Sequence, residues 1–432
     1  MTRSSRKARV LRTAPGLYVW VLSWALVEVA ASADLKPAPA SQEKAQSFGR
    51  RFVGLDKCNV CVGTSMCQKL YKGDIRFSPR LSSHAELPPA NQRSYLGNLT
   101  DDSGTWRPVV LSRLLSPMAQ RLYDRHICTS AGHEPSCSVE NVLRATPRFQ
   151  VWTKSHLLLP PMVKCLSAPL LRCPSQRLLD RVVQRYTEVR DVGTVQMKHF
   201  SEKDKLRLLY TLAANQHSLV LQMFPGPEGW PFPRYHGSCG RVVVWAGTRP
   251  LSSLYSSPLE RRADAAYQLL HIAQSLASNS LQFQLYYTSV SAEMFGYAED
   301  CRVFVVDTST IGVIDLLGYP SDHITHCNHT DVFSCLSGSC TRPPPCNAVR
   351  SSQSFTLLCQ NVLPQLLPSG DLRPPHLPSN VARHLSVCAD AGQSDSTILH
   401  AARALMDILR PIRPCSLPYG YRYPECRYSD TF

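Results

Sequence analysis

The chain has 432 residues, 44% of them hydrophobic, so it can bury the core of one large two-lobed domain or of two modest domains. The formal net charge of +15 favours acidic partners such as anionic glycans or cell surfaces, with general solubility as the alternative explanation. Beyond residue 33 no apolar run is long enough to cross a bilayer, which excludes a transmembrane segment in the mature chain.

The first 33 residues have the features of a secretory signal peptide. Five basic residues within the first twelve precede an apolar stretch at 16–27 and the small-residue sequence Ala31-Ser32-Ala33. A retained signal anchor is the alternative. Loss of residues 1–33 removes five basic residues and one acidic residue, which lowers the formal charge from +15 to +11. We therefore expect a protein secreted through the endoplasmic reticulum and Golgi, a route that excludes nucleic acid as a partner.

Residues 34–103 are expected to form a flexible and Cys-rich N-terminal segment. The C-x-x-C spacing of Cys58 and Cys61 is compatible with redox chemistry or half of a zinc site, but no second C-x-x-C completes a zinc site. Seventeen cysteines in a secreted chain favour structural disulfides, each worth typically ~2–4 kcal/mol. The candidates are Cys58, Cys61, Cys67, Cys128, Cys137, Cys173, Cys239, Cys335, Cys340, Cys346, Cys359, Cys388, Cys415 and Cys426.

Two sequons, at Asn98 and Asn328, predict N-linked glycans. Both lie in stretches that are typical of polar loops. The second is embedded in a run of His and Cys over 322–329 whose side chains could ligate zinc. A glycan inside that run would crowd a metal ion, so we favour a solvated loop there.

Residues 104–250 predict a small lobe with a helical insertion. The expected order is a strand at 108–111, helices at 117–127, 178–189 and 205–214, and strands at 219–224 and 241–245. Pro174-Ser175 supplies a start signal for the second helix. The helices separate two groups of strands, which indicates that they are inserted into one lobe.

Residues 251–432 predict a larger, mainly helical lobe that ends in a Cys/Tyr-rich tail. Its best amphipathic helix places five apolar side chains on one face: Ala266, Leu269, Leu270, Ala273 and Leu276. Apolar strands at 301–306 and 311–314 follow, then a loop from 318 to about 345 and closing helices near 354–366 and 396–409.

The first of these apolar strands ends at an acidic residue, Asp307, as does the strand that carries a magnesium-binding Asp in protein kinases. In kinases the catalytic Asp and a metal-binding Asn lie at fixed distances before that residue. The same spacing places Ser289 at the catalytic position and Met294 at the Asn position. Of these three kinase residues, only the acidic residue at Asp307 is retained.

The sequence resembles the divergent protein kinase domain family over nearly all of the mature chain. The matching segments are Leu55 to Cys58, Cys61 to Ser65, Arg172 to Arg181, Glu228 to Pro231 and Gly237 to Arg241. The resemblance implies an α+β, protein-kinase-like two-lobed fold, divergent, with disulfides and a helical insertion in the small lobe. It implies a location in the secretory pathway but not catalytic activity.

Carried over position by position, the resemblance places Ser112 where kinases have the phosphate-binding strand lysine and Ala119 where they have its glutamate partner. Thr308 and Ser309 replace the usual Phe-Gly after Asp307. A serine hydroxyl is no base at neutral pH, and a methionine thioether is a poor magnesium ligand. Glu293 or Asp315 could replace the missing base, and Asp307 is either a retained metal ligand or a structural acid that caps the next turn.

We therefore predict a secreted glycoprotein that works by binding a protein partner or cell-surface receptor, that is, a pseudokinase with no cofactor. The first alternative is an active atypical kinase that uses ATP with Mg or Mn. The second is a growth-factor-like ligand for a cell-surface receptor. Anionic glycans are a further candidate partner.

Overall fold

The computed structural model describes residues 66–77, 94–100, 103–155, 157–191, 194–197, 199–318, 332–333, 336, 345–368 and 377–414. All of them belong to one unit that spans 45–432. None of the helices in these ranges is both long enough and apolar enough to cross a membrane. The predicted signal peptide, the C-x-x-C pair and Asn328 lie outside the described residues.

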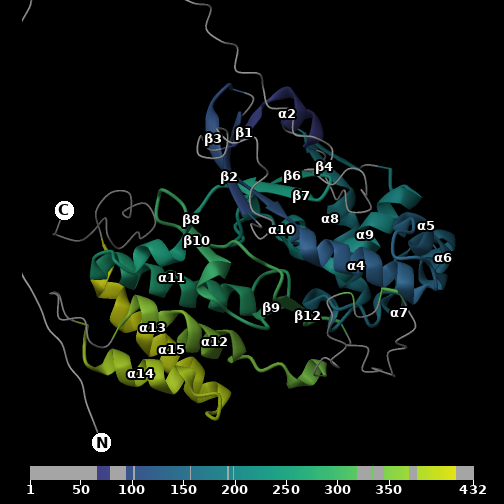
Figure 1. Ribbon diagram of the computed structural model, residues 1–432. Coiled ribbons are helices and arrows are strands. Elements are labelled where there is room, and N and C mark those ends of the chain that lie inside the picture. The colour runs from purple at the N-terminus through teal and green to yellow at the C-terminus, as the bar shows by residue number, and fades with distance from the viewer. Residues whose placement is uncertain are drawn as a thin grey trace, which may run out of the picture. The chain divides into compact units, whose positions relative to one another are not determined.

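The small lobe is built on a five-stranded antiparallel sheet of order β1-β2-β3-β7-β6 (Figure 1). Its strands are β1 (Ile75–Phe77), β2 (Ser94–Thr100), β3 (Trp106–Arg113), β6 (Tyr235–Cys239) and β7 (Val242–Ala246). Because β1 and β2 pair with each other and β2 pairs with β3, the lobe starts before the expected boundary at residue 104.

Side-chain alternation separates the two faces of this sheet. Tyr95 and Leu111 are paired across β2 and β3 and lie on the outer face, in a small core with α2 (Cys67–Lys72). Val110 and Ser112 lie on the opposite, inner face, and Val110 belongs to the main core of the molecule. The strand predicted at 108–111 therefore divides its side chains between two cores.

Asn98 lies within β2 and not in the polar loop that was predicted for it. It is paired with Arg76 of β1 and Pro108 of β3, and it shares the inner face with Leu96, which is 58% exposed. Gly97 and Asn98 are poor strand formers, which accounts for the wrong prediction. Here the glycine is required, since a Cβ at Gly97 would lie 2.6 Å from the Arg76 carbonyl oxygen.

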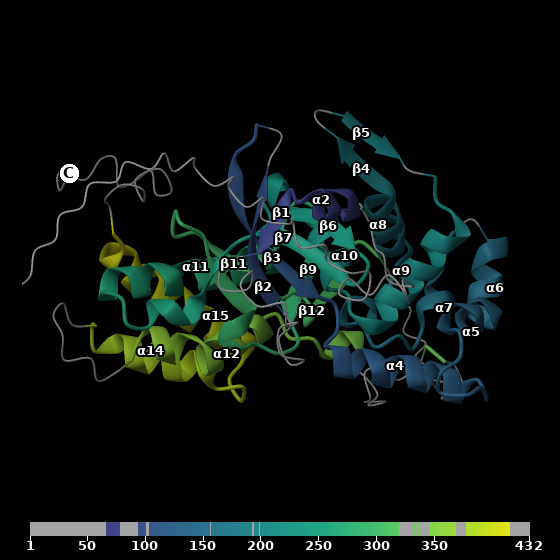
Figure 2. The same ribbon diagram turned by 45° about the horizontal axis from the view of Figure 1, so that its top comes forward.

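Between β3 and β6 the chain inserts a layer of helices, on the right in Figure 1. Its elements are α4 (Pro117–Ser130), α5 (Val139–Ala145), α6 (Pro147–Lys154), α7 (Pro160–Val163), α8 (Gln176–Thr187), β4 (Glu188–Asp191), β5 (Thr194–Met197), α9 (Glu202–Ala214) and α10 (His217–Met223). The β4–β5 hairpin projects beyond the end of α8 (Figure 2). Five of the helices start at a Ser or Thr whose side chain accepts a backbone N–H: Ser116, Ser138, Thr146, Ser175 and Ser201.

The segment 219–224 was predicted as a strand but forms most of helix α10, so that prediction was wrong. Leu219, Val220 and Leu221 are each at most 1% exposed. A short run that is buried on all sides has no periodicity to distinguish a helix from a strand. The helix packs against α8 and β6.

The large lobe combines short strand pairs with a helical bundle. Its elements are β8 (Arg249–Pro250), α11 (Leu259–Ala277), β9 (Phe283–Tyr287), β10 (Phe295–Tyr297), β11 (Val303–Val305), β12 (Ile311–Asp315), α12 (Gln353–Asn361), α13 (Leu363–Leu366), α14 (Asn380–Ala389) and α15 (Asp395–Leu409). β10 pairs with β8 and β11, and β12 pairs with β9. The helices α12, α14 and α15 are grouped beside α11 (Figures 1 and 2).

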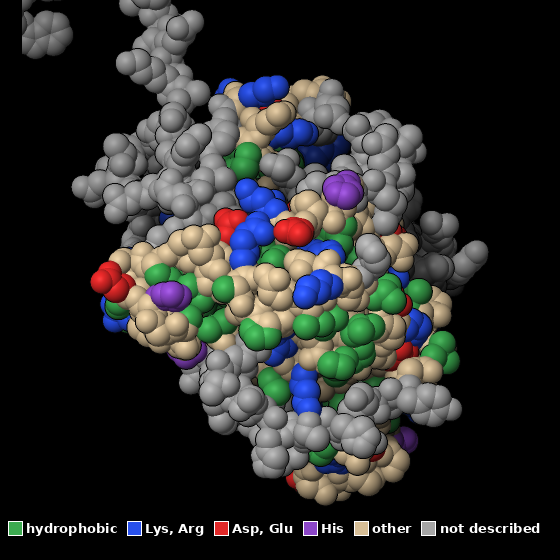
Figure 3. Space-filling model, turned by 90° about the vertical axis from the view of Figure 1, so that its right-hand side faces the viewer, with side chains coloured by type: hydrophobic (Ala, Val, Ile, Leu, Met, Phe, Trp, Pro, Cys, Tyr) green, Lys and Arg blue, Asp and Glu red, His purple; other side chains and the backbone are tan. Residues whose placement is uncertain are grey.

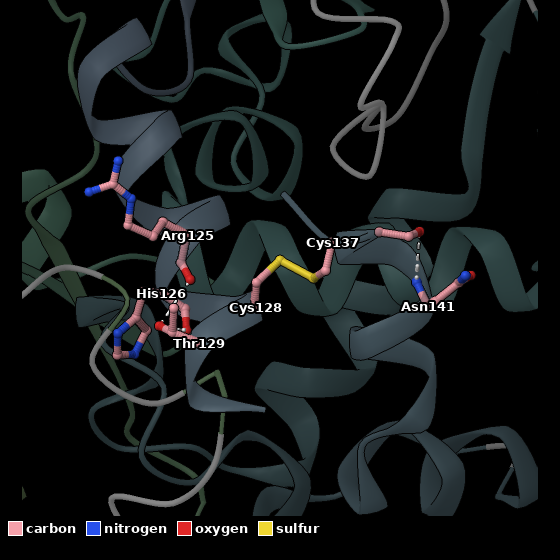
Figure 4. Close-up of a disulfide and its surroundings, with 7 residues drawn as sticks. Arg125, His126, Cys128, Thr129, Cys137 and Asn141 are labelled. Atoms are coloured by element: carbon pink, nitrogen blue, oxygen red, sulfur yellow. Dashed lines mark hydrogen bonds between the residues drawn. A yellow bond between two sulfur atoms is a disulfide. The ribbon is translucent and has the colours of Figure 1, made fainter. Parts of the chain in front are cut away.

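Four disulfides join described residues and use eight of the candidate cysteines: Cys67–Cys239, Cys128–Cys137, Cys173–Cys346 and Cys359–Cys388. The first fastens α2 to β6, the second closes the end of α4 (Figure 4), the third ties the insertion to the large lobe, and the fourth joins α12 to α14. Cys165 is also disulfide-bonded and was not among the candidates. The remaining candidates lie outside the described residues.

Candidate functional site

Ser112 occupies the inner face of β3 and is 6% exposed. Its hydroxyl donates to the backbone carbonyl of Arg113 at 3.3 Å. Arg113 lies on the outer face, where its guanidinium is 5.9 Å from the ring centroid of Tyr95. The strand therefore presents a short neutral hydroxyl, and no cation, at position 112 of its inner face.

Ala119 lies in the first turn of α4, whose N-cap is Ser116. The buried polar groups of this helix are Gln120 and Asp124. The Gln120 amide donates to the Asp124 carboxylate at 3.2 Å and to the Tyr210 hydroxyl oxygen at 3.1 Å. Asp124 also lies 3.5 Å from the guanidinium of Arg241, at the start of β7. This ion pair fixes α4 to the sheet without any contribution from Ser112 or Ala119.

Met294 and Asp307 lie next to each other at the edge of the large lobe. The backbone N–H groups of Val306 and Asp307 both donate to the Met294 carbonyl, at 2.8 and 3.3 Å. The Thr310 hydroxyl lies 3.5 Å from the Met294 sulfur and 3.2 Å from the carbonyl oxygen of Ser289. Met294 is 4% exposed, whereas Ser289 is exposed. Met294, Ser289 and Asp307, the residues selected by the kinase spacing, therefore lie close together in the structure.

Asp307 is partly exposed, with 34% of its side chain accessible. One carboxylate oxygen accepts the Ser309 N–H at 2.9 Å and lies 3.9 Å from Nδ1 of His217. The carboxylate thus caps the turn that follows it, which was the structural alternative to a metal-ligand role.

Residues 215–217, from the end of α9 to the first residue of α10, form a junction that sequence analysis missed. Asn215 donates to the Leu114 carbonyl at the end of β3, at 2.8 Å. Gln216, 1% exposed, accepts the Leu170 N–H at 2.7 Å and donates to the carbonyls of Thr308 and Ile311 at 3.0 and 2.7 Å. The only signal in the sequence is a polar triplet between two apolar helical runs.

His217 completes the junction. Its Nδ1 accepts the Thr308 N–H at 3.1 Å, which requires Nδ1 to be unprotonated, and its carbonyl accepts the Thr308 hydroxyl at 3.0 Å. The Trp245 ring of β7 packs edge-on against the imidazole with centroids 4.9 Å apart. The turn after Asp307 is therefore held by the insertion and the small-lobe sheet together.

The two carboxylates considered as replacement bases differ in their surroundings. Glu293 is exposed beside Met294. Asp315 is 4% exposed and accepts the Ser175 hydroxyl at 2.6 Å and the Arg177 guanidinium, so it anchors α8. Burial raises the pKa of Asp315, but hydrogen bonds from Arg177, Ser175 and the Leu317 N–H lower it to a net value below the usual one. The Asp315 carboxylate therefore has a structural role, as the acceptor for Ser175 and Arg177.

These residues fit magnesium poorly. Magnesium prefers oxygen ligands in an octahedral arrangement, and of the two positions that would hold it only Asp307 carries one. Within the described ranges, no cluster of three His, Cys, Asp or Glu side chains could hold a metal ion. We therefore derive no phosphoryl-transfer step through a bound metal.

Comparison with known proteins identifies the family. Residues 209–391 match the family model described as "Protein-kinase domain of FAM69". Divergent protein kinase domain 2B of Bos taurus is 46% identical over 420 residues, covering 97% of this chain and 96% of its own length; the Homo sapiens protein is 45% identical, with 96% of each chain covered. Divergent protein kinase domain 2A of Xenopus tropicalis is 34% identical, covering 75% of this chain and 77% of its own.

The sheet, the strand pairs around Asp307 and the matching family model define a kinase-like protein. The identity to 2B proteins over almost the full length is higher than that to the 2A protein. The chain belongs to the divergent protein kinase domain family.

Proposed function

We propose that this chain is a pseudokinase of the secretory pathway that acts by binding other molecules. The observation that carries the proposal is the buried thioether of Met294, which lies 3.5 Å from the Thr310 hydroxyl. We assign this residue, from the kinase spacing, to the position of a metal-binding asparagine. A soft sulfur in a packed position supplies neither a charge nor an oxygen ligand.

The missing groups account for a large part of kinase catalysis. Loss of a general base alone lowers a rate by typically ~10²–10⁴. The phosphoryl-transfer transition state depends further on cations that neutralise its charge, and Ser112 supplies none. With Ser289, Met294 and Ser112 at the three positions, the expected turnover is too slow to serve as a function.

The 215–217 junction supports the same proposal. Gln216 and His217 fix the backbone from Thr308 to Ile311 through buried hydrogen bonds. A turn that is held in one conformation suits a scaffold, because a rigid surface loses little entropy when a partner binds.

The retained Asp307 favours one alternative, an active atypical kinase. The test is a thermal-shift titration of the purified mature protein with ATP, with and without Mg²⁺ or Mn²⁺. Asp307→Asn is the matched variant, because asparagine keeps an oxygen to accept the Ser309 N–H but removes the charge. We expect no metal-dependent rise in Tm at millimolar nucleotide. A rise that Asp307→Asn abolishes would establish a live nucleotide site and overturn the pseudokinase proposal.

The second alternative, a ligand for a cell-surface receptor, is distinguished by saturable binding of the labelled protein to cells. We expect the binding to persist when ATP and metal are withheld. Binding that disappears after enzymatic removal of sulfated glycans would identify anionic glycans as the partner instead.

Secretion is part of the proposal and rests on the leader sequence and on the four disulfides. We expect the protein in conditioned medium, with an electrophoretic shift after endoglycosidase treatment. Asn98→Gln and Asn328→Gln separate the two sequons. Asn98 is partly exposed within a paired strand, so its modification would require transfer of the glycan before β2 pairs. A protein that stays in the cells and shows no shift would contradict secretion.

A further inference from the structure

One side of α4 carries large side chains that are exposed and not buried in the core. Met118 and Leu122 are 65% and 50% exposed, and Arg121 and Arg125, which lie one turn further along α4 from each of them, are also exposed. The spacing i, i+3, i+4, i+7 places these four residues in one row along the helix, which we call the α4 stripe. The row is about 10 Å long at the helical rise per residue.

The two arginines of the α4 stripe differ from those of α8. Arg177 of α8 binds the Asp315 carboxylate, and Arg185 binds Glu228 at 2.8 Å. Within the described part of the chain, the guanidinium groups of Arg121 and Arg125 make no ion pair, hydrogen bond or ring contact. Figure 4 shows the Arg125 side chain extending away from the helix on the side opposite the disulfide.

The α4 stripe is presented on a rigid support. The opposite side of the helix is fixed by Asp124, which lies 3.5 Å from Arg241, and by Gln120, which donates to the Tyr210 hydroxyl oxygen. The Cys128–Cys137 disulfide closes the last turn. A helix fixed in this way needs no rearrangement to bind a partner.

We propose that the α4 stripe docks an acidic amphipathic helix of a partner protein; this rests on the proposed function, that the chain acts by binding. Leucine-type side chains of the partner would cover Met118 and Leu122, and its carboxylates would pair with Arg121 and Arg125. Methionine adapts its shape to the groups packed on it.

Other occupants fit the stripe less well. A second copy of the chain, docked through the same stripe, would bring Arg121 and Arg125 against like charges. A lipid surface would need a broader basic and apolar face than one row of four side chains. Figure 3 shows that the face on the right-hand side of Figure 1 carries hydrophobic, Lys or Arg and some Asp or Glu side chains intermixed.

The test uses the full mature chain and a fluorescent helical peptide of leucine and glutamate with i, i+3, i+4, i+7 spacing. Its affinity is compared with that of a leucine and lysine peptide of the same pattern and with anionic vesicles. We expect binding of the acidic peptide only. Arg121→Glu with Arg125→Glu, and separately Met118→Ser with Leu122→Ser, should each weaken it about tenfold or more.

The matched control is Arg383→Glu with Arg403→Glu, the same charge change on exposed positions of α14 and α15. We expect it to leave the affinity within about twofold of the parent, as is usual for charges outside an interface. Equal binding of the two peptides, an equal loss in the control, or binding to vesicles alone would overturn the proposal. None of these results depends on nucleotide, so the ATP titration reports separately on the pseudokinase proposal.

Discussion

Replacing Gln216 with leucine should destabilise the protein strongly although the two side chains have similar volumes. The amide of Gln216 serves three buried backbone groups: the N–H of Leu170 and the carbonyls of Thr308 and Ile311. Leucine provides no acceptor and no donor. All three backbone groups belong to residues that are 0% exposed, so water cannot replace the lost partners without opening the structure.

The magnitude follows from the cost of an unpaired buried polar group. Such a group costs about 1–3 kcal/mol, and an orphaned N–H is tolerated less well than a carbonyl. The Thr308 carbonyl keeps the Ile311 N–H at 3.2 Å, so for one N–H and one carbonyl left unpaired we expect the free energy of unfolding to fall by about 2–4 kcal/mol. Equilibrium urea unfolding followed by tryptophan fluorescence, with the disulfides intact, measures this change. Hydrogen exchange at the Leu170 amide should accelerate in parallel.

Gln222→Leu is the matched control for Gln216→Leu. Gln222 lies on α10 and is only half-buried, and its amide makes one hydrogen bond, to the Ser218 carbonyl at 3.0 Å. We expect a change of about 1 kcal/mol or less there. If Gln216→Leu is no more destabilising than Gln222→Leu, the 215–217 junction does not hold the turn, and the reasoning built on it is refuted.

Three further results are expected. The lowered pKa of Asp315 stabilises the fold above about pH 4 and loses this effect as the pH falls further, so the deficit of Asp315→Ala should shrink between pH 7 and pH 3; a constant deficit would contradict the pKa shift. Met294→Ala should cost about 2–5 kcal/mol in urea unfolding, and a cost under about 1 kcal/mol would mean that Met294 is not packed. Cys173→Ser with Cys346→Ser should lower the free energy of unfolding by about 2–5 kcal/mol, and an unchanged Tm would show that this disulfide does not stabilise the fold.

Local patterns were sufficient for elements that have a clear period or start signal. The apolar face of α11 and the cap at Ser175 follow from residues a few positions apart, and the cap forms as a hydrogen bond in the structure. Run 219–224 had no such signal and was assigned to a strand, whereas it forms α10. The sequon at Asn98 was assigned to a loop because glycine and asparagine are poor strand formers. In the structure Gly97 is required by the close approach of the neighbouring strand.

The candidate site divides in the same way. Ser289, Met294 and Asp307 are close in sequence, so spacing alone brought them together. In the 215–217 junction, Gln216 bonds to Leu170, Thr308 and Ile311, which are 46, 92 and 95 positions away in the chain. No local sequence pattern encodes contacts over such distances. The hydrogen bonds of the junction exist only after the insertion has packed against both lobes.

The Cys173–Cys346 disulfide has a consequence for the order of synthesis. Its cysteines are 173 positions apart, so on the proposed secretory route the bond cannot form until residue 346 has entered the oxidising compartment. By then, on this route, the small lobe, the insertion and the described strands of the large lobe would already have been translocated. Cys173 is without Cys346 during that interval, and a chain truncated before residue 346 would leave it permanently without this partner.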